Sequence, residues 1–237
     1  MRRIILFLVL LVSHSAFIPH SVCCEEISKE KSAFTVGAAY VGNAVSNFSG
    51  GIKTGTDYLG MATIRVGFNT SQAGWWKGGQ FHLHAVNTHG ASPSVELLGD
   101  FQVASNIEAG NHTYVQELWF KQSAGKMEFT VGLQDLNVEF VNTHYGAHYF
   151  NSSFGVMPVI SGNFAAPIFP LTTLGITGKW NISEKTSWLN ALYDGNPADF
   201  NHNPHNLRWS YNEGDGILAI TEIQHNTNCN ELTATYK

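Results

Sequence analysis

"YLGMATIRVGFN", residues 58–69, alternates between apolar and polar or small side chains along its length. Successive side chains of a β-strand point to opposite faces of a sheet, so every second residue shares a face. Ile64 and Val66 therefore lie on one apolar face, whereas Thr63 and Arg65 lie on the other. The stretch predicts a strand with one apolar and one polar face.

The same alternation recurs from Phe34 onward. It is clear in residues 80–87, 114–121, 127–134 and 173–182, and weaker in residues 34–45, 98–105, 187–194 and 216–224. Glycine is frequent, with 23 residues, and no stretch shows the periodicity of an amphipathic helix. The chain is therefore predicted to be an all-β protein of about nine antiparallel strands.

This alternation fits two kinds of β-protein. In a soluble sandwich or barrel, the apolar face points into a core and the polar face meets water. In a transmembrane β-barrel, the apolar face meets lipid and the polar face lines a wet lumen. Because alternation alone does not choose between them, features at and beyond the strand ends decide.

Strand length and strand ends both favour the membrane barrel. Predicted strands of about ten residues match what a tilted strand needs to cross a bilayer. Aromatic side chains lie near predicted strand ends, where an interfacial girdle requires them. These aromatic residues are Tyr58, Phe68, Trp75, Trp76, Phe81, Phe120 and Trp180.

The connection from Asp135 to Leu171 is a third feature that favours a membrane barrel. It is longer than a compact soluble domain usually tolerates, it is rich in Phe, Tyr and Asn, and it contains Pro158, Pro167 and Pro170. A segment of this kind that folds inward would narrow a pore. We therefore expect a transmembrane antiparallel β-barrel whose lumen is constricted by this segment.

The chain begins MRRIILFLVLLVSHSAF, a basic start followed by an apolar run too short to cross a bilayer as a helix. This predicts a secretory signal peptide at residues 1–24, a polar arm at residues 25–33 and a barrel domain at residues 34–237. Removal of Arg2 and Arg3 with the signal leaves 11 basic against 18 acidic residues, a net charge of about −7. Because phosphates would be repelled, no nucleic-acid partner is expected.

Six motifs follow one another in order between about Gly67 and Gln224. They are GWWKGGQFHLHAVNTHG, GDFQVASNIEAG, YVQELWFKQ, VGLQDLNVEF, YFNSSFGVMPVISGNFAAPIFPLTTLG and LYDGNPAD. Together they resemble the OprB family of carbohydrate-selective porins of bacterial outer membranes. The resemblance covers most of the chain and rests on several ordered motifs rather than on one short match.

The resemblance implies a sixteen-stranded barrel in the outer membrane, through which sugars diffuse passively. Its partners would be sugars, outer-membrane lipid and the barrel-assembly machinery. It implies neither a cofactor nor catalysis, and it leaves the oligomeric state open. Because the chain has about nine predicted strands and ends at Lys237, where family members continue, we expect the N-terminal portion of such a protein and a partial barrel. Closure as a smaller barrel and assembly from several copies are the alternatives.

A sugar path needs groups that hydrogen-bond hydroxyls and flat rings that stack on pyranoses, each weakly enough for the sugar to leave. Candidates lie on the predicted lumen face and in the family-like DLNVEF segment. They are Arg65, Glu117, Trp119, Lys121, Asp135, Asn137 and Glu139. The alternative for each residue is a solvated position in the wall of a wide barrel.

His82 and His84 share the polar face of the strand predicted at residues 80–87. Two imidazoles with this spacing suit a metal, but a further ligand is needed and His89 lies beyond the expected strand end. Neutral imidazole also satisfies the polar lining of a porin. We predict that His82 and His84 line the lumen and that no metal is bound.

Two other functions stay open at this level. One is a secreted β-domain that binds sugars and uses its apolar faces as a dry core. The other is an exported glycoside hydrolase, because Asp135 and Glu139 are spaced like an acid and base pair. The sequence contains no nucleophile elbow, Walker motif or dinucleotide glycine motif, so no catalytic residue is assigned.

Overall fold

The computed structural model describes residues 32–100, 103–143, 146, 149–151, 158–197, 199–209, 214–229 and 232–236. These residues form nine β-strands. They are β1 (Phe34–Asn47), β2 (Gly55–Asn69), β3 (Gly79–Gly90), β4 (His112–Ala124), β5 (Met127–Gln134), β6 (Thr173–Asn181), β7 (Thr186–Asp194), β8 (Ile217–Cys229) and β9 (Leu232–Tyr236). The signal peptide predicted at residues 1–24, and most of the polar arm predicted after it, lie outside the described residues.

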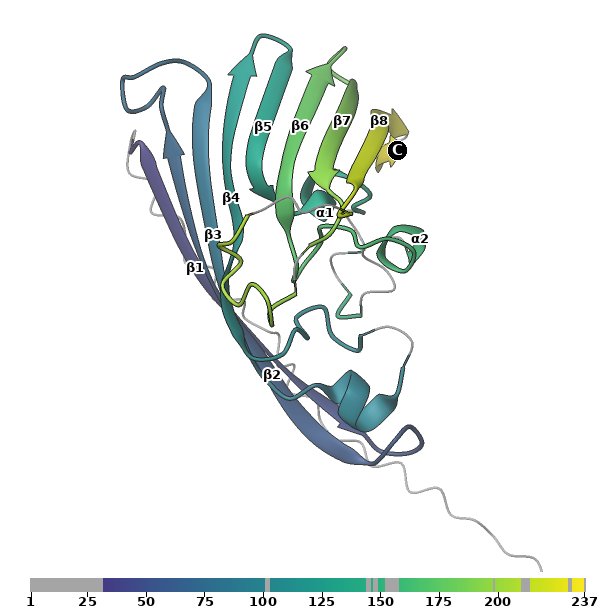
Figure 1. Cartoon of the computed structure of the whole chain (residues 1–237). Coiled ribbons are helices and arrows are strands. Elements are labelled where there is room, and N and C mark those ends of the chain that lie inside the picture. The colour runs from purple at the N-terminus through teal and green to yellow at the C-terminus, as the bar shows by residue number, and fades with distance from the viewer. Residues whose placement is uncertain are drawn as a thin grey trace, which may run out of the picture.

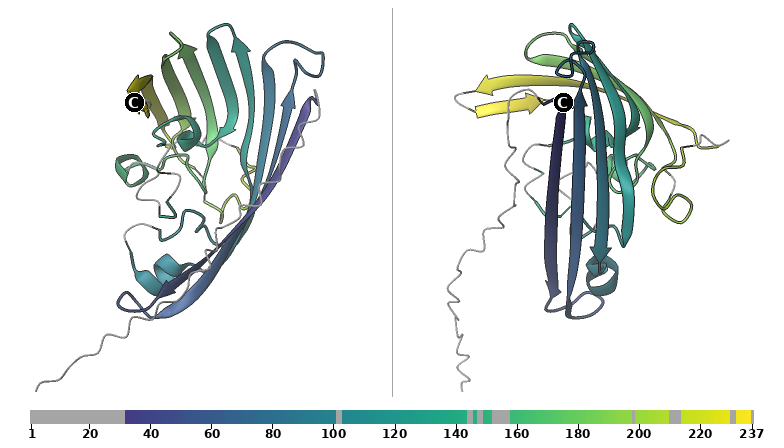
Figure 2. Two further views of the ribbon diagram at one scale, coloured as in Figure 1. Left: turned by 180° about the vertical axis from the view of Figure 1, so that it is seen from behind. Right: turned by 90° about the vertical axis from the view of Figure 1, so that its left-hand side faces the viewer.

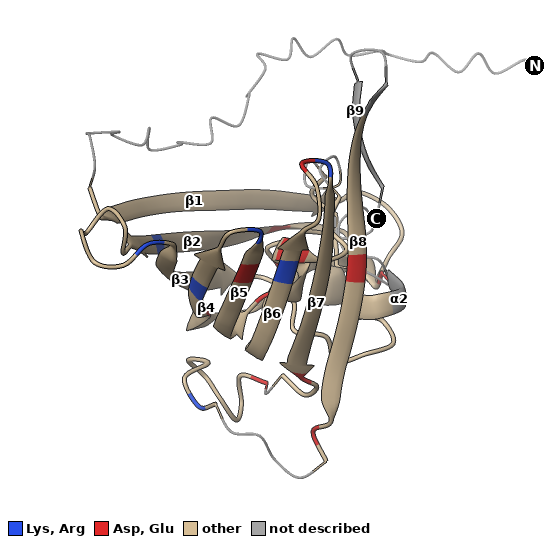
Figure 3. Ribbon diagram, turned by 90° about the horizontal axis from the view of Figure 1, so that it is seen from above, with Lys and Arg blue, Asp and Glu red and all other residues tan. Residues whose placement is uncertain are grey.

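The strands form one antiparallel sheet in which each strand pairs with its neighbours in the chain. The sheet is strongly curved, and the β3–β4 and β5–β6 connections lie on its concave side (Figure 1). Views from behind, from the side and from above show the same curvature (Figures 2 and 3). β1 and β9 are its two edges, so the described strands make the wall of a partial barrel. The predicted all-β antiparallel fold of about nine strands is confirmed.

The described helices are short. They are the π-helix η1 (Ser94–Leu98), α1 (Leu136–Glu139) and α2 (Pro158–Ser161). Within the described chain, no helix has the length and apolar character needed to span a membrane.

The strand predicted at residues 98–105 is wrong, since its described residues form no strand. η1 ends at Gly99 in the left-handed conformation, which glycine adopts without steric cost. Beyond it, the Asn43 side chain of β1 donates a hydrogen bond to Ser105 Oγ at 2.7 Å, and Ala104 N–H donates to Ser94 Oγ at 2.7 Å. Side-chain contacts therefore hold this stretch against the sheet in place of a ladder. β9 was not predicted and supplies the ninth strand.

The face of the sheet that points away from these connections, here the outer face, carries large exposed apolar side chains. Ile64, which pairs with Ala38 and Ala85, is 54 % exposed, and Ile176, which pairs with Val131 and Leu192, is 59 % exposed. A soluble sandwich would cover such residues with a second layer. An exposed apolar face that runs from β1 to β8 is what a lipid-facing wall requires.

Aromatic rings line one end of the outer face. Phe34, Phe68, Phe81 and Phe120 contact one another in series across β1 to β4, with ring centroids 4.7, 6.2 and 4.7 Å apart. At the other end of β2, Tyr58 lies ten positions before Phe68. Ten residues span roughly 33 Å along a strand, or about 25 Å across the membrane at a 40° tilt, which is the height of the apolar band of such barrels.

The long connection between β5 and β6 folds onto the inner, concave face of the sheet. Leu136 and Phe140 at α1 are fully buried and form an apolar cluster with three inward-facing residues of β7, Leu189, Ala191 and Tyr193. This cluster anchors the connection to the wall. The expectation that the segment folds inward is confirmed for its described residues.

The β7–β8 connection also lies against the sheet at its long-loop end. Its His205 backbone carbonyl accepts a hydrogen bond from Val115 N–H at 3.1 Å, and its Asn206 side chain donates to the Thr172 hydroxyl at 2.8 Å. This connection therefore continues the wall beside β4, beyond the point where β5 stops pairing with β4 at Leu118.

Candidate functional site

A β-bulge in β4 determines which side chains face the lumen. Val115 pairs with Ala85 and Glu117 pairs with His84, so Gln116 is an extra residue opposite no partner. The extra residue reverses the alternation within β4. As a result Glu117 lies on the inner face, together with Trp119 and Lys121 further along the strand.

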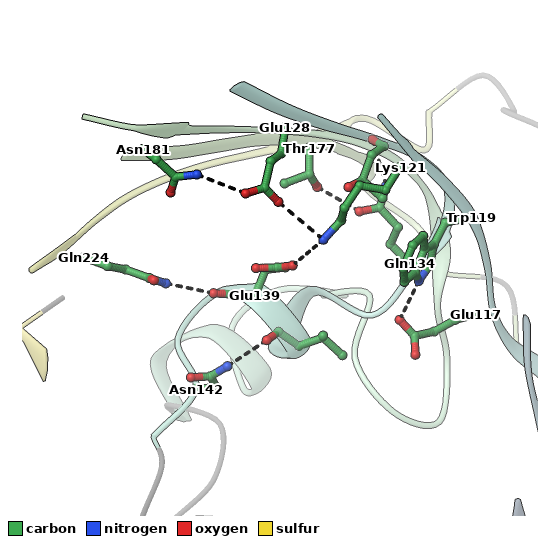
Figure 4. A network of polar contacts seen from close by, with 12 residues as sticks. Glu117, Trp119, Lys121, Glu128, Gln134, Glu139, Asn142, Thr177, Asn181 and Gln224 are labelled. Atoms are coloured by element: carbon green, nitrogen blue, oxygen red, sulfur yellow. Dashed lines mark hydrogen bonds and ion pairs between the residues drawn. The ribbon is translucent and has the colours of Figure 1, made fainter. Parts of the chain in front are cut away.

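Lys121 lies between two carboxylates on the inner face (Figure 4). Its Nζ is 3.2 Å from Glu139 Oε1 of α1 and 3.9 Å from Glu128 Oε2 of β5. Asn181 of β6 donates a hydrogen bond to the other oxygen of Glu128 at 3.0 Å. Because Glu139 belongs to the inward-folded connection, the Lys121–Glu139 pair joins that connection to the barrel wall.

Glu117 forms a second cluster beside the first. Its Oε2 lies 3.4 Å from His84 Nδ1 and 3.9 Å from His82 Nε2, and its Oε1 accepts a hydrogen bond from Trp119 Nε1 at 3.2 Å. The His82 ring stacks on the Trp119 indole at 4.7 Å, and the Lys121 ammonium lies 5.4 Å from the indole centre. The inner wall thus alternates acidic, basic and flat aromatic groups.

Arg65 of β2 extends this polar strip across the sheet. It pairs in register with His84, so its guanidinium lies on the same inner face as the Glu117 cluster. The Arg65 residue is exposed, and among the described residues it forms no ion pair. Of the predicted site residues it is the one most open to solvent on the wall.

Asp135 and Asn137 hold the base of the connection. The Asp135 carboxylate accepts hydrogen bonds from Asn137 N–H at 2.9 Å, from Gln116 Nε2 at 3.1 Å and from Phe169 N–H at 3.1 Å. It therefore ties the start of the connection to its end and to the bulge. Burial raises the pKa of Asp135 to about 6, because desolvation penalises the charged form more than these hydrogen bonds favour it.

A family model supplies the comparison that decides the class of protein. The model for the OprB family of carbohydrate-selective porins matches residues 53–237, which is more than half of the chain. The chain belongs to the OprB family. OprB-family proteins are outer-membrane porins rather than enzymes, so the glycoside hydrolase hypothesis is set aside.

The OprB fold is also found in a solved structure. The high-pH structure of Pseudomonas putida OprB matches with a TM-score of 0.76 and 18 % sequence identity, over 86 % of this chain and 50 % of that chain. The chain therefore spans about half the length of that OprB, and at this identity the likeness concerns the fold. No curated protein matches the sequence.

The OprB-family wall contains contact residues that the sequence did not single out. Alternation placed Glu128 and Gln134 on the polar face, but it gave no sign that Glu128 pairs with Lys121 or that Gln134 accepts a hydrogen bond from Thr177 at 2.8 Å. Glu222 of β8 accepts a hydrogen bond from Val141 N–H of the connection at 2.8 Å. The Glu222 contact depends on the folded connection and the other two depend on the pairing of neighbouring strands, so no local pattern reveals them.

In the part of the chain that the structure describes, no group of three or more His, Cys, Asp or Glu side chains is placed to hold a metal ion. His82 and His84 instead share the Glu117 carboxylate on the lumen wall.

Proposed function

We propose that this chain forms the wall and constriction of a channel through which mono- and oligosaccharides diffuse passively. The observation that carries the proposal is the Lys121–Glu139 pair, which sets a charged, hydrogen-bonding surface of the connection opposite a polar wall. Both the wall and the connection then contribute groups to one narrow part of the lumen. A sugar that passes there exchanges its water for protein donors and acceptors.

The charge balance of this strip favours a neutral polyol over an anion. Counting the histidines as neutral, the carboxylates of Glu117, Glu128 and Glu139 exceed the cations of Lys121 and Arg65 by one negative charge. The same groups offer many hydrogen-bond donors and acceptors in a small area. Such contacts are individually weak, as transport requires.

The predicted residues take different roles in this proposal. Glu117, Trp119, Lys121 and Glu139 contact the sugar, and Arg65 provides a further donor on the open part of the wall. His82 and His84 line the lumen and orient Glu117 and Trp119. Asp135 and Asn137 act through the connection, because their polar groups bond to it and hold its base in place.

The lengths of the connections favour one orientation in the outer membrane. The β4–β5 turn consists of residues 125–126 and the β6–β7 turn of residues 182–185, whereas residues 135–172 and 195–216 form long connections at the other end. Barrels of this kind have short periplasmic turns and long extracellular loops. We therefore assign the turns to the periplasmic side, with export by a signal peptide at residues 1–24, a polar arm at residues 25–33, and insertion by the barrel-assembly machinery.

A liposome-swelling assay on the full chain tests the proposal. Lys121→Gln and Glu139→Gln are expected to change the swelling rate for glucose and maltose by about fivefold, which corresponds to one hydrogen bond of about 1 kcal/mol. Lys77→Gln is the matched control, because Lys77 lies in the β2–β3 turn, away from the lumen pair. Its swelling rates should equal those of the wild type.

Two results would overturn the proposal. One is swelling no faster than that of protein-free liposomes for every sugar. The other is recovery of the chain in buffer after membrane extraction, as a soluble sugar-binding domain would behave.

A further inference from the structure

A groove of about 430 Å³ lies on the outer face of the sheet, across β5 to β8. It is separate from the lumen strip, which lies on the opposite face of the sheet and mainly on β2 to β5. The side chains that shape it are Phe129, Ile176, Gly178, Leu192, Ala219 and Thr221.

Small residues between large ones make this groove. Gly178 and Ala219 leave space among the rings and branched chains of Phe129, Ile176 and Leu192, each of which is at least half exposed. A Cβ atom at Gly178 would meet only the Phe129 ring, at 3.6 Å, which is an ordinary contact. The depression is therefore open space and not a consequence of strained backbone.

The polar groups of the groove are bonded to one another. The Thr221 hydroxyl donates to Asn190 Oδ1 at 2.9 Å and accepts from Trp188 Nε1 at 2.8 Å. These bonds lower the cost of placing the two side chains against hydrocarbon. The groove is thus suited to a flexible apolar chain.

Strand register places a tryptophan row and a basic rim directly above the groove. Phe129 pairs with Gly178, and two residues nearer the turns Met127 pairs with Trp180, which pairs with Trp188. Beyond this row come the turns, with Lys126 and Lys185. Two such steps span roughly 13 Å along the strands, or about 10 Å of depth at a 40° tilt, close to the distance from headgroup to upper acyl chain.

The rim carries more positive than negative charge. Lys126 donates to the Ile182 carbonyl at 3.2 Å, which leaves two of its three N–H groups for a ligand. Glu184, in the same turn as Lys185, opposes it, so one unit of positive charge remains. His225 at the end of β8 bonds to Thr186 and adds a further polar group.

We propose that this groove and rim bind one anionic phospholipid. The acyl chain occupies the groove at Gly178, the glycerol region lies at Trp180 and Trp188, and the phosphate is bound by Lys126 and Lys185. Attraction between lysines and anionic headgroups acts at this level of a membrane. The placement also agrees with the assignment of the short turns to the phospholipid-facing periplasmic side.

Native mass spectrometry of the detergent-solubilised full chain tests this site with two probes, phosphatidylglycerol and phosphatidylcholine. The wild type should bind phosphatidylglycerol more tightly, and Lys126→Gln and Lys185→Gln should each weaken that binding by about fivefold. Gly178→Leu, which fills the groove, should weaken binding of both lipids. Lys77→Gln removes a lysine from the same rim away from the groove, and it should change neither affinity.

Each remaining outcome counts against the proposal. Equal affinity of the wild type for the two lipids would contradict binding of the headgroup by the rim lysines. Unchanged lipid binding by Gly178→Leu would contradict binding of the acyl chain in the groove. A dimer that Gly178→Leu abolishes would show that a second copy of the chain covers this face. None of these readouts depends on sugar flux, so the site can fail while the proposed channel function stands.

Discussion

Ile176 and Thr177 are adjacent in β6, yet they belong to opposite environments. Ile176 on the outer face is 59 % exposed, whereas Thr177 on the inner face is 4 % exposed and donates a hydrogen bond to Gln134. In a soluble β-protein these exposures would be exchanged. This sheet therefore covers its polar side chains and leaves its apolar ones to the surrounding lipid, in keeping with a membrane barrel.

The apolar cluster around Phe140 lies on the otherwise polar inner face. A substitution in this cluster should have the largest effect on stability. Phe140→Ala removes a fully buried ring from the cluster with Leu189 and Tyr193, so the free energy of unfolding should fall by about 3–5 kcal/mol. Denaturant titration of the detergent-solubilised chain measures this loss. Val138→Ala is the control in α1, because Val138 is 55 % exposed, and it should change stability by less than about 0.5 kcal/mol.

A charged residue introduced on the outer face should also destabilise the protein, because that face contacts lipid. Ile64→Arg places a guanidinium near the middle of the apolar band, which costs about 2–4 kcal/mol in a membrane barrel. The adjacent inward-facing change Arg65→Gln should cost far less. Unfolding of both variants in lipid vesicles gives the two values, and equal destabilisation would contradict the assignment of the faces.

Protonation of Asp135 should give a smaller, pH-dependent effect. Its pKa is about 6 in the folded chain against 3.8 for the free group, so between these values the folded state holds a proton that the unfolded state has released. The stabilisation is present below pH 3.8 and is lost as the pH rises through 6, by roughly 3 kcal/mol for a shift of this size.

Thermal unfolding of the wild type and of Asp135→Asn between pH 3.5 and 7 checks the sign. The wild-type unfolding temperature should fall relative to the variant as the pH rises through this window. Parallel curves would show that Asp135 does not titrate there.

Loss of one inner hydroxyl group should have the smallest effect. Thr177→Val removes the 2.8 Å bond to Gln134 and the 3.2 Å bond with the Tyr193 hydroxyl while keeping the side-chain shape, and it should lower the free energy of unfolding by about 1–2 kcal/mol. Ile176→Val on the outer face of the same strand should stay within about 0.5 kcal/mol, because lipid fills the space. A larger loss at Ile176 than at Thr177 would reverse the proposed environments.

The strands could be predicted from sequence because their alternation is local. Residues 58–69 and 127–134 each show both faces, and the structure places them in β2 and β5. Residues 98–105 show weaker alternation, and there the side chains of Asn43 and Ser94 determine the conformation. A short local pattern cannot report such partners because they come from other parts of the chain.

The candidate site was predictable only as a set of residue types on one face. Glu117, Trp119 and Lys121 were placed correctly on the inner face by counting alternate positions within β4. The Lys121–Glu139 pair required the connection to fold back over the wall, which no spacing encodes. Asp135 was expected on the sugar path, and its three hydrogen bonds instead support our proposal that it positions the connection.

The bulge residue Gln116 changes which positions of β4, odd-numbered or even-numbered, face the lumen. Between Gln116 and the short turn, the odd-numbered residues of β4 face the lumen. On the other side of Gln116, toward the long connections, the even-numbered Tyr114, which pairs with Val86, faces inward. Deletion of this one residue would join Val115, opposite Ala85, directly to Glu117, opposite His84, so every other side chain of β4 would keep its face. Related chains that lack the residue should therefore show a single gap here, with the same order of polar and apolar positions on both sides of it.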